Sequence, residues 1–203
     1  MILEAKNIGF RYKNSGYILK NLDFSISSNE RVALLAKSGY GKTTLARIMS
    51  GYLKQNWGEV LIDGEEIPGS GFHPVQLIYQ HPEKTFNPKW KMKKSLEENG
   101  NPDEKLIDLL EIKGTWLDRY PSELSGGELQ RFAIARAITQ ETKFIIADEI
   151  TAMLDGISQA QIWHSLIEIT KKRNIGMIVI THNRELADKV CTSIVKLHEI
   201  NNI

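Results

Sequence analysis

The sequence predicts an α/β fold built around a mostly parallel β-sheet. Three observations support this prediction. Short apolar runs of strand length recur along the chain, at 31–35, 143–149 and 175–183. Stretches with the apolar spacing of helices lie between them, and strands that alternate with helices are typical of parallel sheets. A glycine-rich loop joins the first apolar run to a helix, which is the beginning of a βα unit.

The composition is that of an ordinary globular chain. The 203 residues are 41% hydrophobic and 25% charged, which suits one sizeable α/β domain. The formal net charge of +1 gives no general attraction to nucleic acid. The single cysteine, Cys191, allows neither an intramolecular disulfide nor a cysteine-ligated metal cluster. No secretory signal is visible, and no apolar run approaches the roughly 20 residues of a membrane span, so we expect a soluble, cytoplasmic protein.

The N-terminal third predicts an antiparallel β part around the first βα unit. Residues 1–12 and 21–36 alternate apolar and polar side chains and are rich in β-branched and aromatic residues, as strands are. Residues 43–53 have helical spacing. Residues 58–67 predict a hairpin that turns at Asp63-Gly64.

Residues 81–125 predict a small, mostly helical insert. The segment is polar, and its prolines precede a helical stretch that contains Leu106, Leu109 and Leu110. The lysines between Lys89 and Lys94 could form a nucleic-acid patch. Acidic residues follow at once, however, and favour a solvated face.

The last third predicts the remaining helices and strands of the sheet. In chain order we expect a helix at 125–139, a strand at 143–149, a helix at 156–174, a strand at 175–183, a helix at 184–190 and a strand at 192–200. Residues 1–80 and 126–203 would then form one core, with the helical insert between them, in a single domain.

The loop AKSGYGKTT, from Ala36 to Thr44, almost matches the phosphate-binding pattern G-x-x-x-x-G-K-[ST]. Its glycines let backbone N–H groups turn inward around phosphate oxygens, and the helix that follows adds its partial positive charge. The candidate nucleotide-binding residues are therefore Lys37, Ser38, Gly39, Tyr40, Gly41, Lys42, Thr43 and Thr44. The alternative is a glycine turn before a helix with no ligand.

Within this loop, Lys42 would reach the β- and γ-phosphates, and the hydroxyl of Thr43 would bind Mg²⁺. Thr44 could add a phosphate contact. Ala36 stands where the pattern has its first glycine. We expect a negative φ at Ala36, at which a methyl group is tolerated, whereas a positive φ would imply strain.

Two carboxylates and a histidine follow buried strands. Asp148 lies at the carboxyl end of the run FIIAD, where open α/β sheets place their ligands, and suits the Mg²⁺ shell. Glu149 is the candidate to polarise an attacking water. A capped helix start would explain one carboxylate but not two. His182 follows the run IVIT. A lone histidine is usually structural, but a glycine-rich loop and an Asp-Glu pair in the same sheet favour a γ-phosphate-sensing role.

The motif LSGGELQ, at 124–130, supplies a second phosphate-binding surface. Gly126 and Gly127 open a helix, so that Ser125 and nearby N–H groups can face a phosphate. A site with two phosphate-binding faces suggests that ATP lies between two subunits.

With these motifs in place, the sequence resembles the nucleotide-binding subunit of an ATP-binding cassette (ABC) transporter over nearly the whole chain. Residues 36–44 resemble Walker A, residues 144–149 Walker B, and residues 124–130 the signature motif, which in this family completes the ATP site of the partner. His182 lies in a stretch that resembles the switch-histidine motif. The motifs follow one another in the family's order.

The resemblance implies further site residues. Gln80 stands in the Q-loop, whose glutamine senses Mg²⁺ and water and couples to the membrane subunit, and Asp155 ends a stretch that resembles the D-loop. Tyr12 lies where the family has its adenine-stacking aromatic. Phe10 and Tyr17 are rivals for that role, and Tyr12 could also be an ordinary strand aromatic.

Two stretches, YQHPEKTFNP and RYPSELSGGELQR, resemble the dipeptide, oligopeptide and nickel branch of ABC importers, which takes up peptides, nickel or metal–metallophore complexes. Departures from the family pattern are Ala36, Ile150 in place of proline, and Glu128 in place of glutamine. We expect no C-terminal extension with a cysteine cluster. The short ending and the stretch DEITAMLD incline the prediction toward nickel or a metallophore complex.

The resemblance implies an ATP-hydrolysing subunit, with ATP and Mg²⁺ as cofactors, at the cytoplasmic face of the cell membrane. Its implied partners are integral membrane permease subunits, a second ATPase subunit, identical or related, and indirectly an extracytoplasmic solute-binding protein. No nucleic acid is expected. The alternatives are an ABC ATPase outside transport, acting on nucleic acid or ribosomes, and a non-hydrolysing regulatory cassette.

Overall fold

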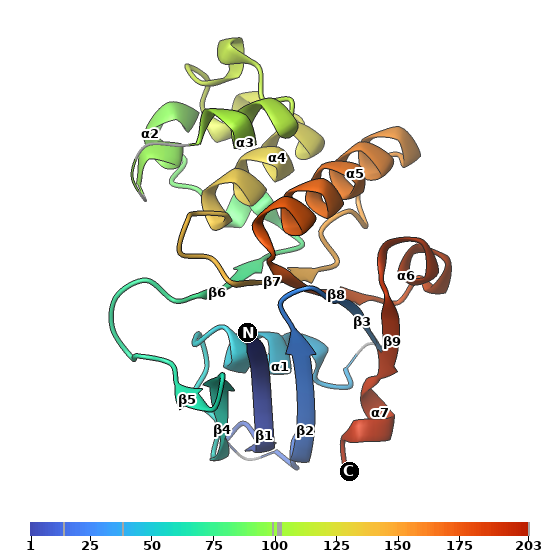
Figure 1. The fold of residues 1–203 in the computed structure, drawn as a ribbon. Helices are drawn as coiled ribbons and strands as arrows, with labels where there is room; N and C mark the ends of the chain where they lie inside the picture. Colours follow the sequence, from blue (N-terminus) through green and yellow to red (C-terminus); the bar gives the residue numbers. More distant parts are fainter. Residues whose placement is uncertain (14, 38, 99, 101–102, 203) are drawn as a thin grey trace.

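The computed structural model describes residues 1–13, 15–37, 39–98, 100 and 103–202. Figure 1 shows three layers: an antiparallel sheet, a parallel sheet beside it, and the helices α2 to α5 on the far side of the parallel sheet. Helix α1 lies between the two sheets and packs in the same hydrophobic cluster as both of them. The predicted α/β architecture is confirmed.

The antiparallel sheet has the strand order β2-β1-β4-β5. Its strands are β1 (Ile2–Phe10), β2 (Leu19–Ser27), β4 (Trp57–Ile62) and β5 (Glu65–Glu66). Asp63 and Gly64 join β4 to β5 with φ angles of 52° and 85°. Two successive positive φ angles are what a tight two-residue hairpin requires, so the predicted hairpin is confirmed.

The parallel sheet has the strand order β6-β7-β8-β3-β9. Its strands are β6 (Val75–Ile78), β7 (Phe144–Asp148), β8 (Gly176–Thr181), β3 (Arg31–Leu35) and β9 (Ser193–Lys196). Every neighbouring pair is parallel, so the carboxyl ends of these strands lie along one edge. Sequence patterns missed β6, because a run of four residues behind Pro74 is too short to show a period.

The helices are α1 (Lys42–Met49), α2 (Met92–Glu97), α3 (Glu104–Leu109), α4 (Gly126–Ala137), α5 (Gly156–Arg173), α6 (Arg184–Val190) and α7 (Leu197–Ile200). The prediction of one strand over 192–200 is wrong in its second half, because β9 ends at Lys196 and α7 follows. Leu197 and Ile200 both pack on the core. Their spacing of three residues fits one turn of helix. None of the helices in the described part of the chain is both long and apolar enough to cross a bilayer.

The buried side chains of the parallel sheet alternate between two hydrophobic clusters. On β7, Ile145 and Ala147 face the cluster of the helical layer, whereas Phe144 and Ile146 face the cluster shared with α1 and the antiparallel sheet. This alternation follows from the two-residue period of a strand. Both faces of the sheet are therefore covered, and ligands can reach it only at its edges.

The segment of residues 82–123, which contains α2 and α3, shares its hydrophobic core with the rest of the chain. Met92, Leu96 and Leu110 are buried in the same cluster as apolar residues of α4, α5 and the parallel sheet. The four lysines of 89–94 are exposed, and Nζ of Lys94 lies 4.2 Å from the ring centroid of Trp90. The division of the chain into a core and an insert at 81–125 stays a prediction.

Candidate nucleotide-binding site

The candidate site residues leave the parallel sheet along its carboxyl edge. β3 runs into the glycine-rich loop, β6 runs toward Gln80, β7 ends at Asp148 and β8 is followed by His182. Because β8 pairs with both β7 and β3, the loops that follow these three strands are neighbours in space. The parallel topology thus gathers residues that are far apart in the sequence.

The glycine-rich loop turns through two positive φ angles, 85° at Gly39 and 90° at Gly41. Gly41 is the N-cap of α1 and offers no side-chain cap, so the first N–H groups of the helix stay available to an anion. A β-carbon on Gly41 would also lie 2.8 Å from Cγ2 of Ile18, so a larger residue here would have to displace Ile18 as well as adopt the positive φ. Lys37 and Tyr40, within the loop, are exposed, and Ser38 lies outside the described residues.

The Lys42 side chain curls back into the loop. Its Nζ donates hydrogen bonds to the carbonyl oxygens of Ala36, at 2.7 Å, and Lys37, at 3.0 Å. The side chain is buried, with 8% of the residue's surface exposed. An ammonium group has three donors, so one N–H remains for an incoming phosphate. Thr44, also buried, follows in the first turn of α1.

Ala36 has no left-handed backbone. The non-glycine residues with positive φ in the described chain are Asn7, Asn21, Asp63, Glu111, Glu149 and Asn174. The expectation of a negative φ at Ala36 is therefore confirmed. The side chain is half-buried and packs against the core cluster of α1 and the antiparallel sheet.

We expect Ala36→Gly to leave the affinity for ATP within about twofold of the unmodified chain. The backbone at Ala36 does not need glycine, and added freedom in the unfolded chain should lower the free energy of unfolding by about 0.4–1 kcal/mol. Nucleotide titration and urea unfolding measure the two effects. A severalfold gain in ATP affinity would instead show that the methyl group distorts the loop.

Asp148 and Thr43 place two oxygen atoms side by side. The Thr43 hydroxyl donates a 2.9 Å hydrogen bond to Oδ2 of Asp148, which joins the start of α1 to the end of β7. Burial raises the pKa of the Asp148 carboxyl, and the Thr43 hydrogen bond acts in the opposite direction. A divalent cation would stabilise the ionised carboxylate here, and carboxylate and hydroxyl oxygens are ligands that Mg²⁺ accepts. The donor set therefore fits this metal.

Glu149 is held in a strained conformation that points it at His182. Its φ is 50°, an uncommon value for a side chain of this size. Its backbone N–H donates to the carbonyl of Ile180 at 3.0 Å, and its Oε1 lies 3.2 Å from Nδ1 of His182. Side-chain exposure is 22% for Glu149 and 68% for His182, so water can reach both.

A cavity of about 460 Å³ opens beside the glycine-rich loop. It is lined by Leu35, Ala36, Lys37, Tyr40, His182, Lys196 and His198. The loop and His182 thus border one space, and most of the polar side chains around it are basic. Such a lining suits an anion or an acidic group.

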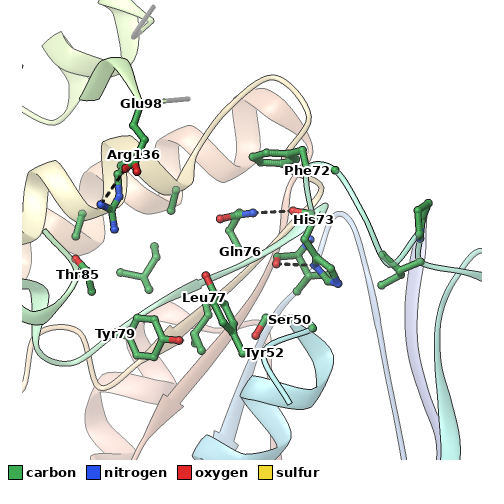
Figure 2. A pocket seen from close by; sticks show the side chains of 18 of the residues that line it. Ser50, Tyr52, Phe72, His73, Gln76, Leu77, Tyr79, Thr85, Glu98 and Arg136 are labelled. Carbon is green, nitrogen blue, oxygen red and sulfur yellow. Dashed lines mark hydrogen bonds and ion pairs between the residues drawn. The ribbon is translucent and has the colours of Figure 1, made fainter. Parts of the chain in front are cut away.

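A larger pocket, of about 910 Å³, lies between the end of α1, β6 and α4. Figure 2 shows Tyr52, Tyr79 and His73 on one side of it and the ion pair of Arg136 with Glu98, 3.5 Å apart, on the other. Tyr79 immediately precedes Gln80, which is half-buried. The pocket therefore adjoins the loop that carries Gln80 and is distinct from the cavity beside the glycine-rich loop.

Ser125 is the N-cap of α4 and takes part in a capping box. Its hydroxyl accepts from the N–H of Glu128 at 3.3 Å, and the Glu128 carboxylate accepts from the N–H of Ser125 at 2.8 Å. The pattern S-x-x-E at Ser125 to Glu128 is the sequence signal for this box, which was not predicted above. Glu128 thus helps to fix the end of the helix. Gly126 and Gly127 supply first-turn N–H groups that have no acceptor within the helix.

Asp155 caps the neighbouring helix, α5. Its carboxylate accepts from the backbone N–H groups of Ile157 and Ser158 and from the Ser158 hydroxyl, the last at 2.6 Å. The Ser158 hydroxyl bond holds the pKa of Asp155 below its usual value. A β-carbon on Gly127 would lie 3.7 Å from Ser158, so the N-termini of α4 and α5 adjoin.

The helix N-termini that carry Ser125 and Asp155 form a second group, apart from the first. Among the described residues, no hydrogen bond, ion pair or ring contact joins either side chain to Lys42, Asp148 or His182. The structure therefore brings together one set of predicted site residues, at the carboxyl edge of the sheet, and leaves the signature residues separate from it.

The three aromatic candidates for adenine differ in accessibility. Phe10 is 5% exposed and belongs to the core, whereas Tyr12 is 43% exposed and meets Phe10 edge-on at a centroid distance of 4.9 Å. Tyr17 is 38% exposed and packs against Trp57. Tyr12 and Tyr17 are therefore the accessible candidates for stacking on adenine, and Tyr12 is the more exposed of the two.

A glycine loop between a buried strand and a helix, with Asp148 and Glu149 at the end of another strand of the same parallel sheet, defines a P-loop nucleotide-binding protein. The ABC transporter family model matches residues 19–152, and the chain belongs to that family. It is the ATP-binding subunit of an ABC transporter, an ATPase that couples the hydrolysis of ATP to transport.

The sequence is similar to the nickel import system ATP-binding protein NikE of Staphylococcus aureus. The identity is 32% over 212 residues for the protein of strain bovine RF122 / ET3-1 and 31% over 211 residues for that of strain N315, and each match covers 98% of this chain and 87% of the relative.

Solved structures confirm the ABC ATPase fold. A dimeric post-hydrolysis state of the ATP-binding cassette MJ0796, bound to ADP and Pi, matches with a TM-score of 0.82 and 24% identity over 96% of this chain and 93% of that one. The cassette cbiO1 from Clostridium perfringens, part of the transporter complex cbiONQ, matches with a TM-score of 0.79 and 24% identity over 96% and 83%.

Proposed function

We propose that this ATPase powers a membrane importer that takes up nickel, a metal–metallophore complex or peptides. The observation that carries the proposal is the similarity to the NikE proteins over 98% of the chain. The subunit would act at the cytoplasmic face of the membrane, bound to integral permease subunits, with an extracytoplasmic solute-binding protein as an indirect partner.

The glycine-rich loop would hold the phosphates of ATP. The backbone N–H groups of the loop would surround the phosphates, Lys42 would meet the β- and γ-phosphates with its remaining N–H, and Thr44 could add a phosphate contact. Tyr12 would stack on adenine. Thr43, Asp148 and Gln80 would hold Mg²⁺, which when bound neutralises phosphate charge.

Glu149 and His182 would organise the attacking water. The hydrogen-bonded pair fixes the direction of the carboxylate, and the carboxylate can take a proton from water while His182 faces the γ-phosphate. The strained backbone at Glu149 supports this role, since such strain gathers at functional sites.

The signature residues would complete the site of a second cassette. Ser125, Gly126 and Gly127 lie apart from the chain's own P-loop, and Asp155 adjoins them, so a head-to-tail partner is the natural complement to this surface. The partner is an identical chain or a related one, and we favour the related one. The pocket beside Gln80 would receive a segment of the permease.

Uptake assays in a strain that lacks this chain test the proposal. We expect the loss of ⁶³Ni or of labelled dipeptide accumulation, with recovery when the unmodified chain is restored and no recovery with Glu149→Gln. Normal uptake of nickel, metallophore complexes and peptides would contradict the importer. Purification with nucleic acid or ribosomes, or a lack of ATPase activity with every partner, would favour the two alternative functions.

A further inference from the structure

Residues near the C-terminus hold the beginning of β2. Oδ1 of Asn201 accepts from the backbone N–H of Lys20 at 2.9 Å, and its Nδ2 donates to the carbonyl of Ile18 at 3.0 Å. The next residue, Asn202, donates from its backbone to the carbonyl of Lys20 and from its side chain to that of Asn21, both at 3.1 Å. β2 is the edge strand of its sheet, and Figure 1 shows α7 beside it.

Ile18 connects this contact to the P-loop. A β-carbon on Gly41 would lie 2.8 Å from Cγ2 of Ile18 and 3.2 Å from its carbonyl oxygen, so Ile18 packs directly against the N-cap of α1. Asn201 therefore donates to the carbonyl of Ile18, the residue through which the β1–β2 loop packs on the phosphate-binding loop.

The β1–β2 loop, residues 11–18, carries Tyr12. The N–H of Ile18 donates to the carbonyl of Phe10 at 2.9 Å, which closes the loop at its base. The Ser15 hydroxyl donates to the carbonyl of Tyr12 at 2.9 Å, and the rings of Tyr12 and Phe10 meet edge-on. Because Ile18 is bonded to Phe10 and Phe10 contacts Tyr12, a shift of Ile18 against Gly41 would also shift Tyr12.

We propose that Asn201 is a positioning residue for the adenine end of the nucleotide site. By holding Ile18 and Lys20, its amide fixes the β1–β2 loop against the P-loop and so sets the distance between Tyr12 and the phosphate-binding turn. The inference rests on the proposed function in one respect, that Tyr12 is the aromatic side chain that stacks on adenine.

Asn202 provides a matched control. It is exposed, its side chain reaches Asn21 rather than Ile18, and its backbone bond to Lys20 survives truncation to alanine. Asn202→Ala therefore removes one side-chain hydrogen bond from the same contact without touching the residue that packs on Gly41.

Binding of magnesium ATP and of magnesium tripolyphosphate to the full chain tests the proposal, because only the first ligand has an adenine. We expect Asn201→Ala to weaken ATP binding about three- to tenfold, the range for one or two ordinary hydrogen bonds, and to leave tripolyphosphate binding unchanged. In turnover, KM should rise while kcat is kept. Asn202→Ala should change both affinities by less than about twofold.

Two further variants sharpen the test. Asn201→Asp keeps the acceptor for Lys20 but places a carboxylate oxygen against the Ile18 carbonyl, so it should weaken ATP binding at least as much as alanine does. In a Tyr12→Ala background, Asn201→Ala should add little further loss, since both changes act on one stacking contact.

Equal weakening for ATP and tripolyphosphate would overturn the proposal, because Asn201 would then support the P-loop or the fold as a whole. Unchanged ATP affinity in Asn201→Ala would also overturn it. If Tyr12→Ala weakens ATP binding and Asn201→Ala does not, only the positioning role fails. If the unmodified chain does not bind ATP, the proposed function itself fails.

Discussion

Replacing Glu149 with glutamine is expected to lower the rate of ATP hydrolysis by at least about 100-fold while ATP still binds. Glutamine has nearly the same shape, and its carbonyl oxygen can still accept a hydrogen bond from His182, so the pair seen at 3.2 Å can persist. The amide cannot take a proton from water, and general-base catalysis contributes roughly 10²–10⁴-fold. ATP affinity should stay within about threefold, because the phosphates are held by the P-loop.

Phosphate release and equilibrium nucleotide binding measure the two halves of this prediction. Glu185→Gln is the matched control, since Glu185 is an exposed glutamate in the first turn of α6, close to His182 in the sequence. It should hydrolyse ATP at the normal rate. Undiminished hydrolysis by Glu149→Gln would remove Glu149 from the catalytic role.

Lys42→Ala should reduce ATP affinity by about 100-fold and bring hydrolysis below detection. Two effects add. The variant loses a charge-assisted hydrogen bond to phosphate, worth about 1.5–3 kcal/mol. It also loses the two bonds, at 2.7 and 3.0 Å, with which Nζ ties together the carbonyls of Ala36 and Lys37, so that the loop is no longer preorganised.

Lys42→Arg separates these effects. Arginine keeps the charge, but its planar fork does not fit a loop that is wrapped around a compact ammonium group, so affinity should remain low. Lys54→Ala, at an exposed lysine, serves as control. Isothermal titration calorimetry and thermal unfolding of each variant are the measurements. Tight ATP binding by a stably folded Lys42→Ala would contradict the role of Lys42.

Features that depend on a few adjacent residues were predictable from the sequence. The buried strand of Phe144–Asp148, the glycine turn before Lys42 and the hairpin at Asp63 are each signalled by local composition. Glu149 and His182, whose catalytic roles stay predictions, both follow apolar runs of the sequence, and the carboxyl ends of parallel strands meet at one edge.

Features that depend on contacts between distant segments were not predictable. The strand Val75–Ile78 is short and is recognisable only by its pairing with β7. The positive φ of Glu149 is imposed by its surroundings rather than by its residue type. The hydrogen bonds that Asn201 donates to Ile18 and accepts from Lys20 join residues more than 180 positions apart, and no local sequence pattern predicts them.

Helix α4 joins two surfaces that would otherwise be remote. Its first residues follow Ser125, and its last turns contribute Ala133, Arg136 and Ala137 to the pocket beside Gln80. The helix has twelve residues and is therefore about 18 Å long at 1.5 Å per residue. If the pocket receives a permease segment as proposed, a displacement at this end of α4 would be carried along the helix to the signature residues at the other end.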